Sequence, residues 1–150
     1  MYADVAGRYK VASIHGGYHY EMHFICQSTN SIKTYGMQNL QLVPEIIDKH
    51  LSYVATNFPN EEDGDLTNRT VEYVENGVYD VIKGTRIRTD SAQYYKSIKT
   101  HKVRTKYRVK HEFSAGYTQR RNGMIERSFR TIHDKANAMR SARRMGKEWW

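Results

Sequence analysis

The sequence predicts an α/β protein in which a mixed sheet of five strands is flanked by helices. Two observations carry this prediction. Segments that alternate in polarity, as β-strands do, are followed by segments whose apolar residues recur every three or four positions, as in amphipathic helices. Their order along the chain, β-β-β-α-β-α-β-α, is typical of a sheet with helices packed against it.

The first three predicted strands lie before residue 40, and Asp4 belongs to the first of them. Residues 18–26 alternate in polarity along the second strand. One face carries Tyr20, Met22, Phe24 and Cys26, and the opposite face carries His19, Glu21, His23 and Ile25. The turn-forming residues 28–30 then allow residues 31–37 to pair back as a hairpin strand.

A helix and an acidic insertion follow. Pro44 suits the first turn of this helix. Its apolar stripe comprises Val43, Ile47, Leu51, Val54 and Phe58. Residues 59–80 hold seven acidic residues and one basic residue, which indicates an exposed acidic insertion. Residues 81–89 then resume as a strand that ends at Asp90.

The remainder of the chain predicts two helices separated by a short strand and a loop. The first helix carries Tyr94, Tyr95, Ile98 and Val103, and residues 109–113 form the strand. The polar residues between Gly116 and Gly123 predict a mobile loop over 116–123. The final basic helix spans about residues 122–145, with Asn122 as its N-cap. Its apolar stripe comprises Ile125, Phe129, Ile132, Ala136 and Met139.

Length and composition predict one globular domain over residues 1–150. Hydrophobic residues make up 39% of the chain and charged residues 27%, which is typical of a soluble protein. No segment is apolar enough to span a bilayer, so no membrane association is expected. The single cysteine, Cys26, excludes an internal disulfide. We expect a nuclear or cytoplasmic protein.

The net charge of +8 is unevenly distributed. Residues 1–95 have a net charge of −4, whereas residues 96–150 have a net charge of +12. A basic region beside a mildly acidic remainder indicates a polyanionic partner bound on one side. The alternative is a solvated basic surface without a partner.

Three acidic residues have positions that suit a catalytic site. Asp4 lies on the first strand, Asp90 ends a later strand, and Glu126 lies on the final helix. Glu126 is one residue past Ile125, about 100° around the helix, which puts it at the edge of the packed face. Thirty-five residues separate Asp90 from Glu126.

These residues and their flanking motifs resemble the catalytic core of copia-type LTR retrotransposon integrases, which belong to the Asp-Asp-Glu family. The resemblance covers nearly the whole chain. The matching motifs are Asp4-Val5-Ala6-Gly7, Gly16-Gly17-Tyr18-His19-Tyr20 to Phe24-Ile25, Arg88-Thr89-Asp90, His111-Glu112-Phe113-Ser114-Ala115-Gly116-Tyr117-Thr118, and Asn122-Gly123-Met124-Ile125-Glu126-Arg127.

The resemblance implies a ribonuclease H-like fold and a two-ion site for Mg²⁺ or Mn²⁺. Asp4 would bridge both ions, and Asp90 and Glu126 would each hold one. Two such ions stabilise the attacking and leaving oxygens of an in-line displacement at phosphorus. The implied reactions are trimming of the ends of the element's DNA and their transfer into target DNA. The resemblance also implies a homodimer.

The same helix supplies the expected DNA contacts. Arg130 and His133 lie four and seven residues after Glu126 and therefore share its face. The resemblance implies that they contact the DNA ends. The full set of expected DNA-binding residues is Arg120, Arg121, Asn122, Arg127, Arg130, His133 and Arg140. Binding through such a phosphate track should weaken steeply with salt.

A zinc site is the alternative interpretation of His15, His19, His23 and Cys26. These residues lie within or beside a strand, where Cys26 has the opposite parity to the three histidines. The sequence therefore favours ordinary structural roles for them.

Departures from the family pattern leave a second function open. Arg8 stands where the family has proline, and Ala92 stands where it has glycine after the second aspartate. The accessory zinc and C-terminal DNA-binding domains of the family are also missing, which indicates a fragment, a decayed copy or a domesticated gene. The second hypothesis is a degenerate core that binds nucleic acid or a protein without catalysis. A third is a related ribonuclease H-like nuclease, which RNA–DNA hybrid cleavage would identify.

Overall fold

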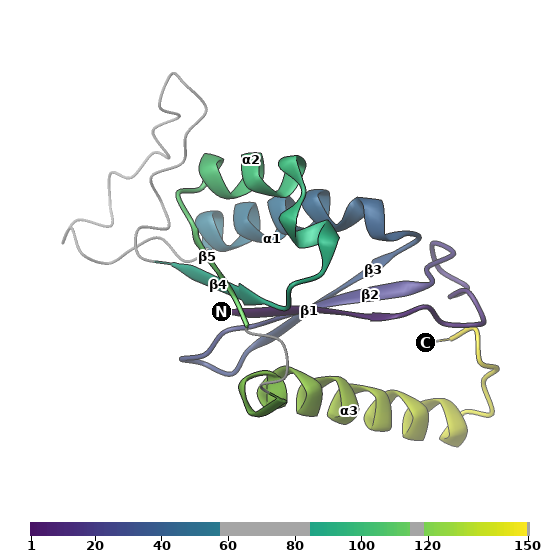
Figure 1. Ribbon diagram of the computed structural model, residues 1–150. Coiled ribbons are helices and arrows are strands. Elements are labelled where there is room, and N and C mark those ends of the chain that lie inside the picture. Colours follow the sequence, from purple (N-terminus) through teal and green to yellow (C-terminus); the bar gives the residue numbers. More distant parts are fainter. Residues whose placement is uncertain (58–84, 115–118, 150) are drawn as a thin grey trace.

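Five strands form one mixed sheet in the order β3-β2-β1-β4-β5 (Figure 1). The computed structural model describes residues 1–57, 85–114 and 119–149. The strands are β1 (Tyr2–Gly7), β2 (Tyr20–Ile25), β3 (Ile32–Met37), β4 (Arg86–Thr89) and β5 (Lys110–Phe113). The central strand β1 pairs antiparallel with β2 and parallel with β4. The predicted five-stranded mixed sheet is therefore confirmed, while the predicted acidic insertion at 59–80 lies outside the described residues.

Helices cover both faces of the sheet. Helices α1 (Val43–Asn57) and α2 (Ile98–Lys106) lie on one face, and α3 (Gln119–Ala142) lies on the other (Figure 1). Two short 3₁₀ helices, η1 (Leu40–Leu42) and η3 (Gln93–Lys96), precede α1 and α2. Within the described part of the chain, no helix has the length and apolar character needed to cross a membrane.

The two faces of β2 are both buried but differ in chemistry. Met22 and Phe24 belong to the main apolar core, and the Phe24 ring stacks on His50 of α1 with the ring centres 3.8 Å apart. On the other face, the His23 ring stacks on Phe129 of α3 at 3.9 Å. The predicted alternation along β2 is confirmed, and the polar face of the strand is the one that receives α3.

The single helix predicted after Asp90 is wrong, because the chain breaks at Ser97 into η3 and α2. Ser97 has extended backbone angles, and its hydroxyl oxygen accepts a hydrogen bond from the Thr100 amide at 3.2 Å. A serine in this role caps a new helix and competes with continuation of the previous one. Ile98, which was predicted to share one helix with Tyr94 and Tyr95, is 77% exposed at the start of α2.

The start of the last helix also differs from the prediction. Helix α3 begins at Gln119, so the backbone of residues 119–123 is helical and Asn122 lies inside the helix instead of capping it. Glutamine and arginine are good helix formers, and their polarity mimics a loop in the sequence. The remainder of the predicted loop, residues 116–118, lies outside the described residues.

The predicted apolar stripe of α3 packs over only its first part. Ile125 is buried and Phe129 is half-buried against the sheet, whereas Met139 is 71% exposed. The physical reason is that the second half of the helix borders a pocket instead of the apolar core.

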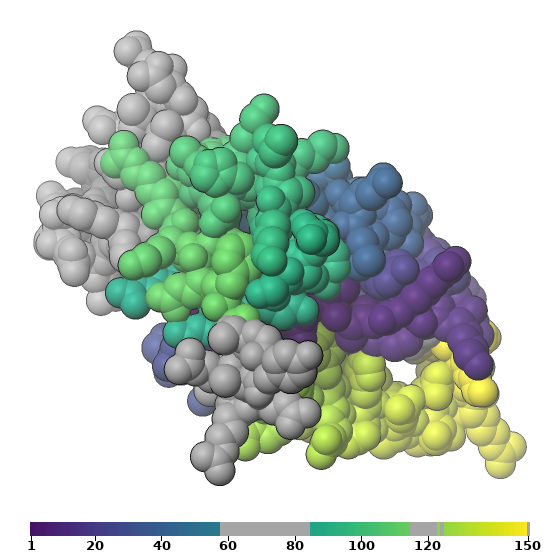
Figure 2. Space-filling view, viewed as in Figure 1, coloured from purple at the N-terminus to yellow at the C-terminus, as the bar shows by residue number. Residues whose placement is uncertain are grey.

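Helix α3 ends in a Schellman motif. Arg144 has a φ of 53°, its amide donates to the Ser141 carbonyl at 3.1 Å, and the Met145 amide donates to the Arg140 carbonyl at 3.0 Å. The chain then turns back towards the loop after β1, where the Ile14 amide donates to the Glu148 carbonyl at 2.7 Å. Figure 2 shows this C-terminal segment in yellow against the purple N-terminal residues.

Gly7 at the end of β1 is expected to tolerate no side chain. Its φ is +121°, and a Cβ would lie 2.6 Å from the His19 carbonyl oxygen and 2.9 Å from Cδ1 of Tyr20. Gly7→Ala should lower the free energy of unfolding in urea by at least about 2 kcal/mol. Gly17→Ala is the matched control, because Gly17 also has a positive φ (+62°) but no atom within 4 Å of a Cβ. Its expected loss is about 1 kcal/mol, and equal losses in the two variants would contradict the steric argument.

Candidate functional site

Asp4 lies on the central strand, and its carboxylate is influenced by both other predicted acids. Its Oδ1 accepts a hydrogen bond from the Val5 amide at 2.9 Å. The pKa of Asp4 is raised to about 6, first by burial and then by the negative charges of Asp90 and Glu126, although the Val5 hydrogen bond acts in the opposite direction. The fold therefore brings β1, the end of β4 and the start of α3 within electrostatic reach of one another at Asp4.

Asp90 sits in a turn directly after β4. Its Oδ1 accepts a hydrogen bond from the Ala92 amide at 3.0 Å, which is an Asx-type turn. Ala92 has a φ of −61°, a value open to any residue. Alanine at position 92, where the integrase pattern has glycine, therefore introduces no backbone strain at this point.

A hydrogen-bonded group behind β4 holds the strand end that presents Asp90. The Ser114 hydroxyl and the Ser114 amide both donate to the Thr89 carbonyl at 2.8 Å. The Thr89 hydroxyl donates to the Asp90 carbonyl at 2.9 Å and lies 2.7 Å from His111 Nε2. Burial lowers the pKa of His111 to about 4, with a further contribution from Arg104, so His111 is neutral at neutral pH. These residues give a structural role to the sequence motif that contains His111 and Ser114.

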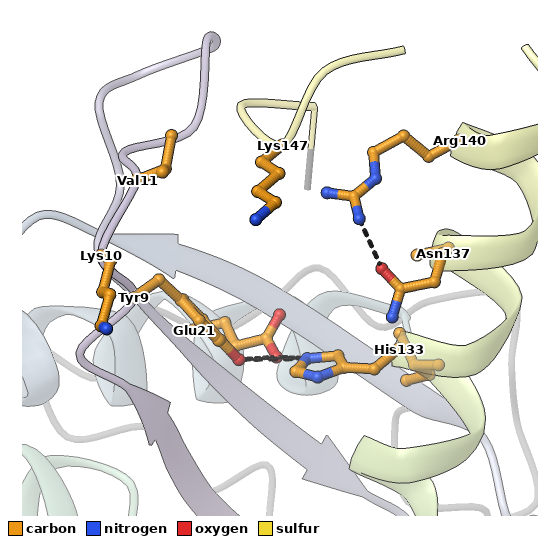
Figure 3. A pocket seen from close by; sticks show the side chains of 10 residues that line it. Tyr9, Lys10, Val11, Glu21, His133, Asn137, Arg140 and Lys147 are labelled. Atoms are coloured by element: carbon orange, nitrogen blue, oxygen red, sulfur yellow. Dashed lines mark hydrogen bonds and ion pairs between the residues drawn. The ribbon is translucent and has the colours of Figure 1, made fainter. Parts of the chain in front are cut away.

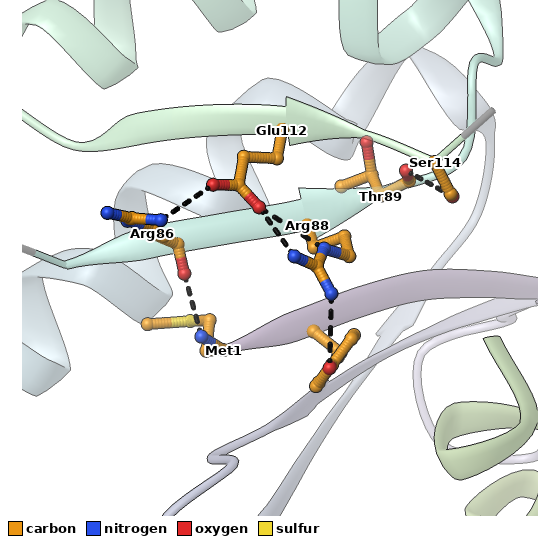
Figure 4. A network of polar contacts seen from close by, with 7 residues as sticks. Met1, Arg86, Arg88, Thr89, Glu112 and Ser114 are labelled. Atoms are coloured by element: carbon orange, nitrogen blue, oxygen red, sulfur yellow. Dashed lines mark hydrogen bonds and ion pairs between the residues drawn. The ribbon is translucent and has the colours of Figure 1, made fainter. Parts of the chain in front are cut away.

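Ion pairs further along β4 and β5 fix the pairing of these two strands. Glu112 accepts from Arg88 at 2.7 Å and from Arg86 at 3.1 Å (Figure 4). The N-terminal amino group of Met1 donates to the Arg86 carbonyl at 2.7 Å, which joins β1 to β4. The strand that ends at Asp90 is therefore tied on both sides.

Two tyrosines beside the acids were not predicted as site residues. The pKa of Tyr94 is raised to about 12, first by burial and then by the charges of Asp90 and Asp4. The pKa of Tyr95 is also raised by burial and then by Asp4. Both phenols therefore remain protonated at neutral pH next to the carboxylates. The sequence signal was limited to their position shortly after Asp90.

The donor set suits a hard divalent cation. Carboxylate oxygens are ligands that Mg²⁺ and Mn²⁺ prefer, and the charge crowding that raises the pKa of Asp4 is what such a cation would relieve. Glu126 is exposed at the edge of α3. Among the described residues, however, no three acidic, histidine or cysteine side chains are close enough to hold one ion together. The charges of Asp90 and Glu126 thus act on Asp4, but the three carboxylates are not close enough together to bind the same ion.

The expected DNA-binding residues divide into four groups. Arg127 and Arg130 are exposed on α3. Arg140 is half-buried, and its guanidinium donates to Asn137 Oδ1 at 3.0 Å. His133 is engaged within the protein. The side chains of Arg120, Arg121 and Asn122 lie outside the described residues.

His133 belongs to a polar network that joins α3 to the sheet. Its Nε2 bonds Glu21 Oε1 and lies 3.0 Å from Tyr9 Oη, and the Tyr9 hydroxyl donates to Glu21 Oε1 at 2.7 Å (Figure 3). His23 Nε2 lies 3.5 Å from the same oxygen, an ion-pair distance longer than a good hydrogen bond. Burial alone would raise the pKa of Glu21, but contacts with His23, Tyr9 and His133 lower it to about 2. Glu21 is therefore a buried, ionised anchor for α3.

The four residues considered for zinc each have separate partners. His15 packs edge-on against Trp149, and His19 Nδ1 lies 2.9 Å from the Tyr9 carbonyl. His23 stacks on Phe129, and Cys26 Sγ lies 3.1 Å from Ser28 Oγ. Each of the four residues therefore has a contact of its own within the fold.

Comparisons with known proteins bear on the fold alone. No family model matches the sequence, and no curated protein is significantly similar to it. Among solved structures, the chain is similar to one in the cryo-electron microscopy structure of the simian T-cell lymphotropic virus intasome in complex with PP2A regulatory subunit B56 gamma. The TM-score is 0.62 at 15% identity, and the match covers 94% of this chain and 40% of that chain. The predicted ribonuclease H-like fold is confirmed, and the likeness to the intasome chain is one of fold alone.

Proposed function

We propose that this chain is the metal-dependent catalytic core of a retrotransposon-type integrase, closest to the copia type, that cuts and joins DNA. One observation carries the proposal: on an integrase-like fold, the Asp4 carboxylate is influenced by the charges of both Asp90 and Glu126. These are the three acids whose spacing and flanking motifs resemble the Asp-Asp-Glu signature.

In this proposal Asp4, Asp90 and Glu126 hold Mg²⁺ or Mn²⁺, with Asp4 shared between two ions. When bound, the ions would stabilise the attacking and leaving oxygens at the reacting phosphate. Asp4 must lose its proton to act as a ligand, and with a pKa of about 6 it is ionised at neutral pH. The turn at Ala92 and the Thr89–His111–Ser114 hydrogen bonds orient Asp90.

The DNA partner of this site would lie along α3. Arg127 and Arg130 are exposed on the helix that carries Glu126, and residues 96–150 have a net charge of +12. Phosphate contacts of this kind supply affinity without sequence preference. The remaining proposed DNA contacts are Arg120, Arg121, Asn122, His133 and Arg140. A homodimer, as in related integrase cores, is part of the same proposal.

A second candidate is a core that binds nucleic acid or a partner without catalysis. The observation that favours it is the spacing of the acids, since within the described residues they do not form a three-ligand group. The two candidates differ in whether a divalent cation draws these carboxylates together.

The deciding experiment is a Mn²⁺ titration by calorimetry of the wild type, Asp90→Asn and Asp134→Asn. Asp134 is an exposed acid of α3 and serves as the matched control. We expect saturable binding in the wild type and in Asp134→Asn, and affinity lower by about 10- to 100-fold or more in Asp90→Asn. The wild-type affinity should also fall about fivefold from pH 6 to pH 5, since the ionised fraction of Asp4, with a pKa of about 6, falls from about one half to about one tenth. No binding, or binding indifferent to Asp90, would favour the second candidate.

A further inference from the structure

A pocket of about 350 Å³ lies between the second half of α3 and the loop after β1. It is separate from the candidate site at Asp4, Asp90 and Glu126. His133, which lines the pocket, follows Glu126 by seven residues, about 10 Å along the helix. Its volume lies within the range typical of small-molecule sites. The pocket has a polar floor, an apolar wall and a basic mouth.

Three cations from different segments line the pocket. Arg140 of α3 and Lys147 of the segment after the Schellman turn face each other at the mouth, and Lys10 of the loop after β1 lies across the pocket beside Tyr9 (Figure 3). Among the described residues, none of the three forms an ion pair with a carboxylate. Bringing like charges to one opening is electrostatically unfavourable unless an anion lies between them.

The floor carries a single carboxylate. Glu21 is 7% exposed, and its hydrogen bonds with Tyr9 and His133 both use Oε1. In Figure 3 the other oxygen of Glu21 points towards the space between Lys147 and Arg140. Because Glu21 is ionised, this oxygen repels a bare anion but accepts a hydrogen bond from a hydroxyl or amino group. A ligand that fits would therefore have a hydrogen-bond donor at one end, for Glu21, and an anionic group at the other, for the basic mouth.

The wall between them is apolar. Val11, Ile132 and Ala136 line it, and Val11 is 41% exposed. Such a surface suits a sugar or a planar base placed between a phosphate and a hydrogen-bond donor.

We propose that this pocket binds a nucleotide, with its phosphate between Arg140 and Lys147, the charge of Lys10 adding to the attraction, and a hydroxyl or amino group on Glu21. The nucleotide is either free or part of a single strand, because the recognition chemistry is the same. The site contains none of the proposed metal ligands, and it shares Arg140 and His133 with the proposed DNA contacts.

The test is calorimetric titration with dAMP in the presence of EDTA, so that metal binding at Asp4, Asp90 and Glu126 makes no contribution. The test variant combines Lys10→Ala and Lys147→Ala, two exposed positions where folding should be unaffected. The matched control is Lys99→Ala together with Lys102→Ala on α2, on the opposite face of the sheet. We expect dAMP affinity to fall about tenfold or more in the pocket variant and to stay unchanged in the control.

Three further arms resolve the ligand. A short single-stranded oligonucleotide bound with the same lysine dependence, without dAMP binding, would assign the nucleotide to a strand. Glu21→Gln should weaken dAMP binding while strengthening binding of inorganic phosphate. Inorganic phosphate that binds the wild type as tightly as dAMP would overturn the proposal. Equal binding of dAMP and of the oligonucleotide by both double variants, or no binding of either by the wild type, would also overturn it.

Discussion

Glu126→Gln is expected to lower Mn²⁺-dependent cleavage and joining of DNA by about 10³-fold. The substitution preserves the size of the side chain but removes the charge of one of three carboxylates proposed to hold the metal. Loss of a metal's charge stabilisation is worth several kcal/mol in the transition state, which corresponds to this factor. The measurement is a single-turnover assay with labelled duplex DNA at saturating protein.

Asp134→Asn provides the control for this prediction. Asp134 is an exposed acid on the same helix, two turns further on, so it changes the charge of α3 equally without touching the proposed site. DNA affinity in EDTA should be similar in both variants, because Arg127 and Arg130 are retained. Activity in Glu126→Gln within about twofold of the wild type would remove Glu126 from the site.

Asp4→Asn is expected to stabilise the protein at neutral pH while abolishing metal binding. The folded-state pKa of Asp4 is about 6 and its ordinary value is 3.8. The folded state therefore holds the proton more tightly, and stability falls as the pH rises through the window from about 4 to 6. Above this window the ionised Asp4 costs up to about 3 kcal/mol. Asparagine removes this cost, so the gain should be near its maximum at pH 7 and near zero at pH 4.

Urea unfolding at pH 4, 5, 6 and 7 in EDTA measures this difference. Asp134→Asn should give a difference near zero at every pH, since Asp134 is exposed. Added Mn²⁺ should stabilise the wild type and leave Asp4→Asn unchanged. A gain that is constant from pH 4 to pH 7 would show that the charge of Asp4 is not its source.

The sheet could be predicted from the sequence because its signals are local. Alternation along residues 20–25 reflects the two faces of a strand, and the stripe that begins at Val43 reflects one face of a helix. The helix boundaries after Asp90 were harder to predict from the sequence. Ser97 ends one helical segment and caps the next, and in the sequence it differs little from an ordinary surface serine.

The candidate site could be predicted only where it depends on residue type and spacing. Asp4, Asp90 and Glu126 were predicted in this way. Contacts between distant parts of the chain could not be found, since Tyr9 and His133 are separated by 124 positions. For the same reason the sequence suggested a DNA contact for His133, which in the fold also pairs with Glu21.

The parallel pairing of β1 with β4 also has a consequence for how the protein folds. Hairpin contacts among β1, β2 and β3 are local, but the N-terminal residue reaches its partner Arg86 only after 85 positions of chain. Closing so long a loop costs conformational entropy before any contact repays it. During synthesis the hairpins can therefore form first. At that stage β1, which carries Asp4, is paired with β2 but not yet with β4, so Asp90 and then Glu126 reach Asp4 later. The three acids of the candidate site thus come together late in folding, and a chain that stops before α3 lacks the third of them, Glu126.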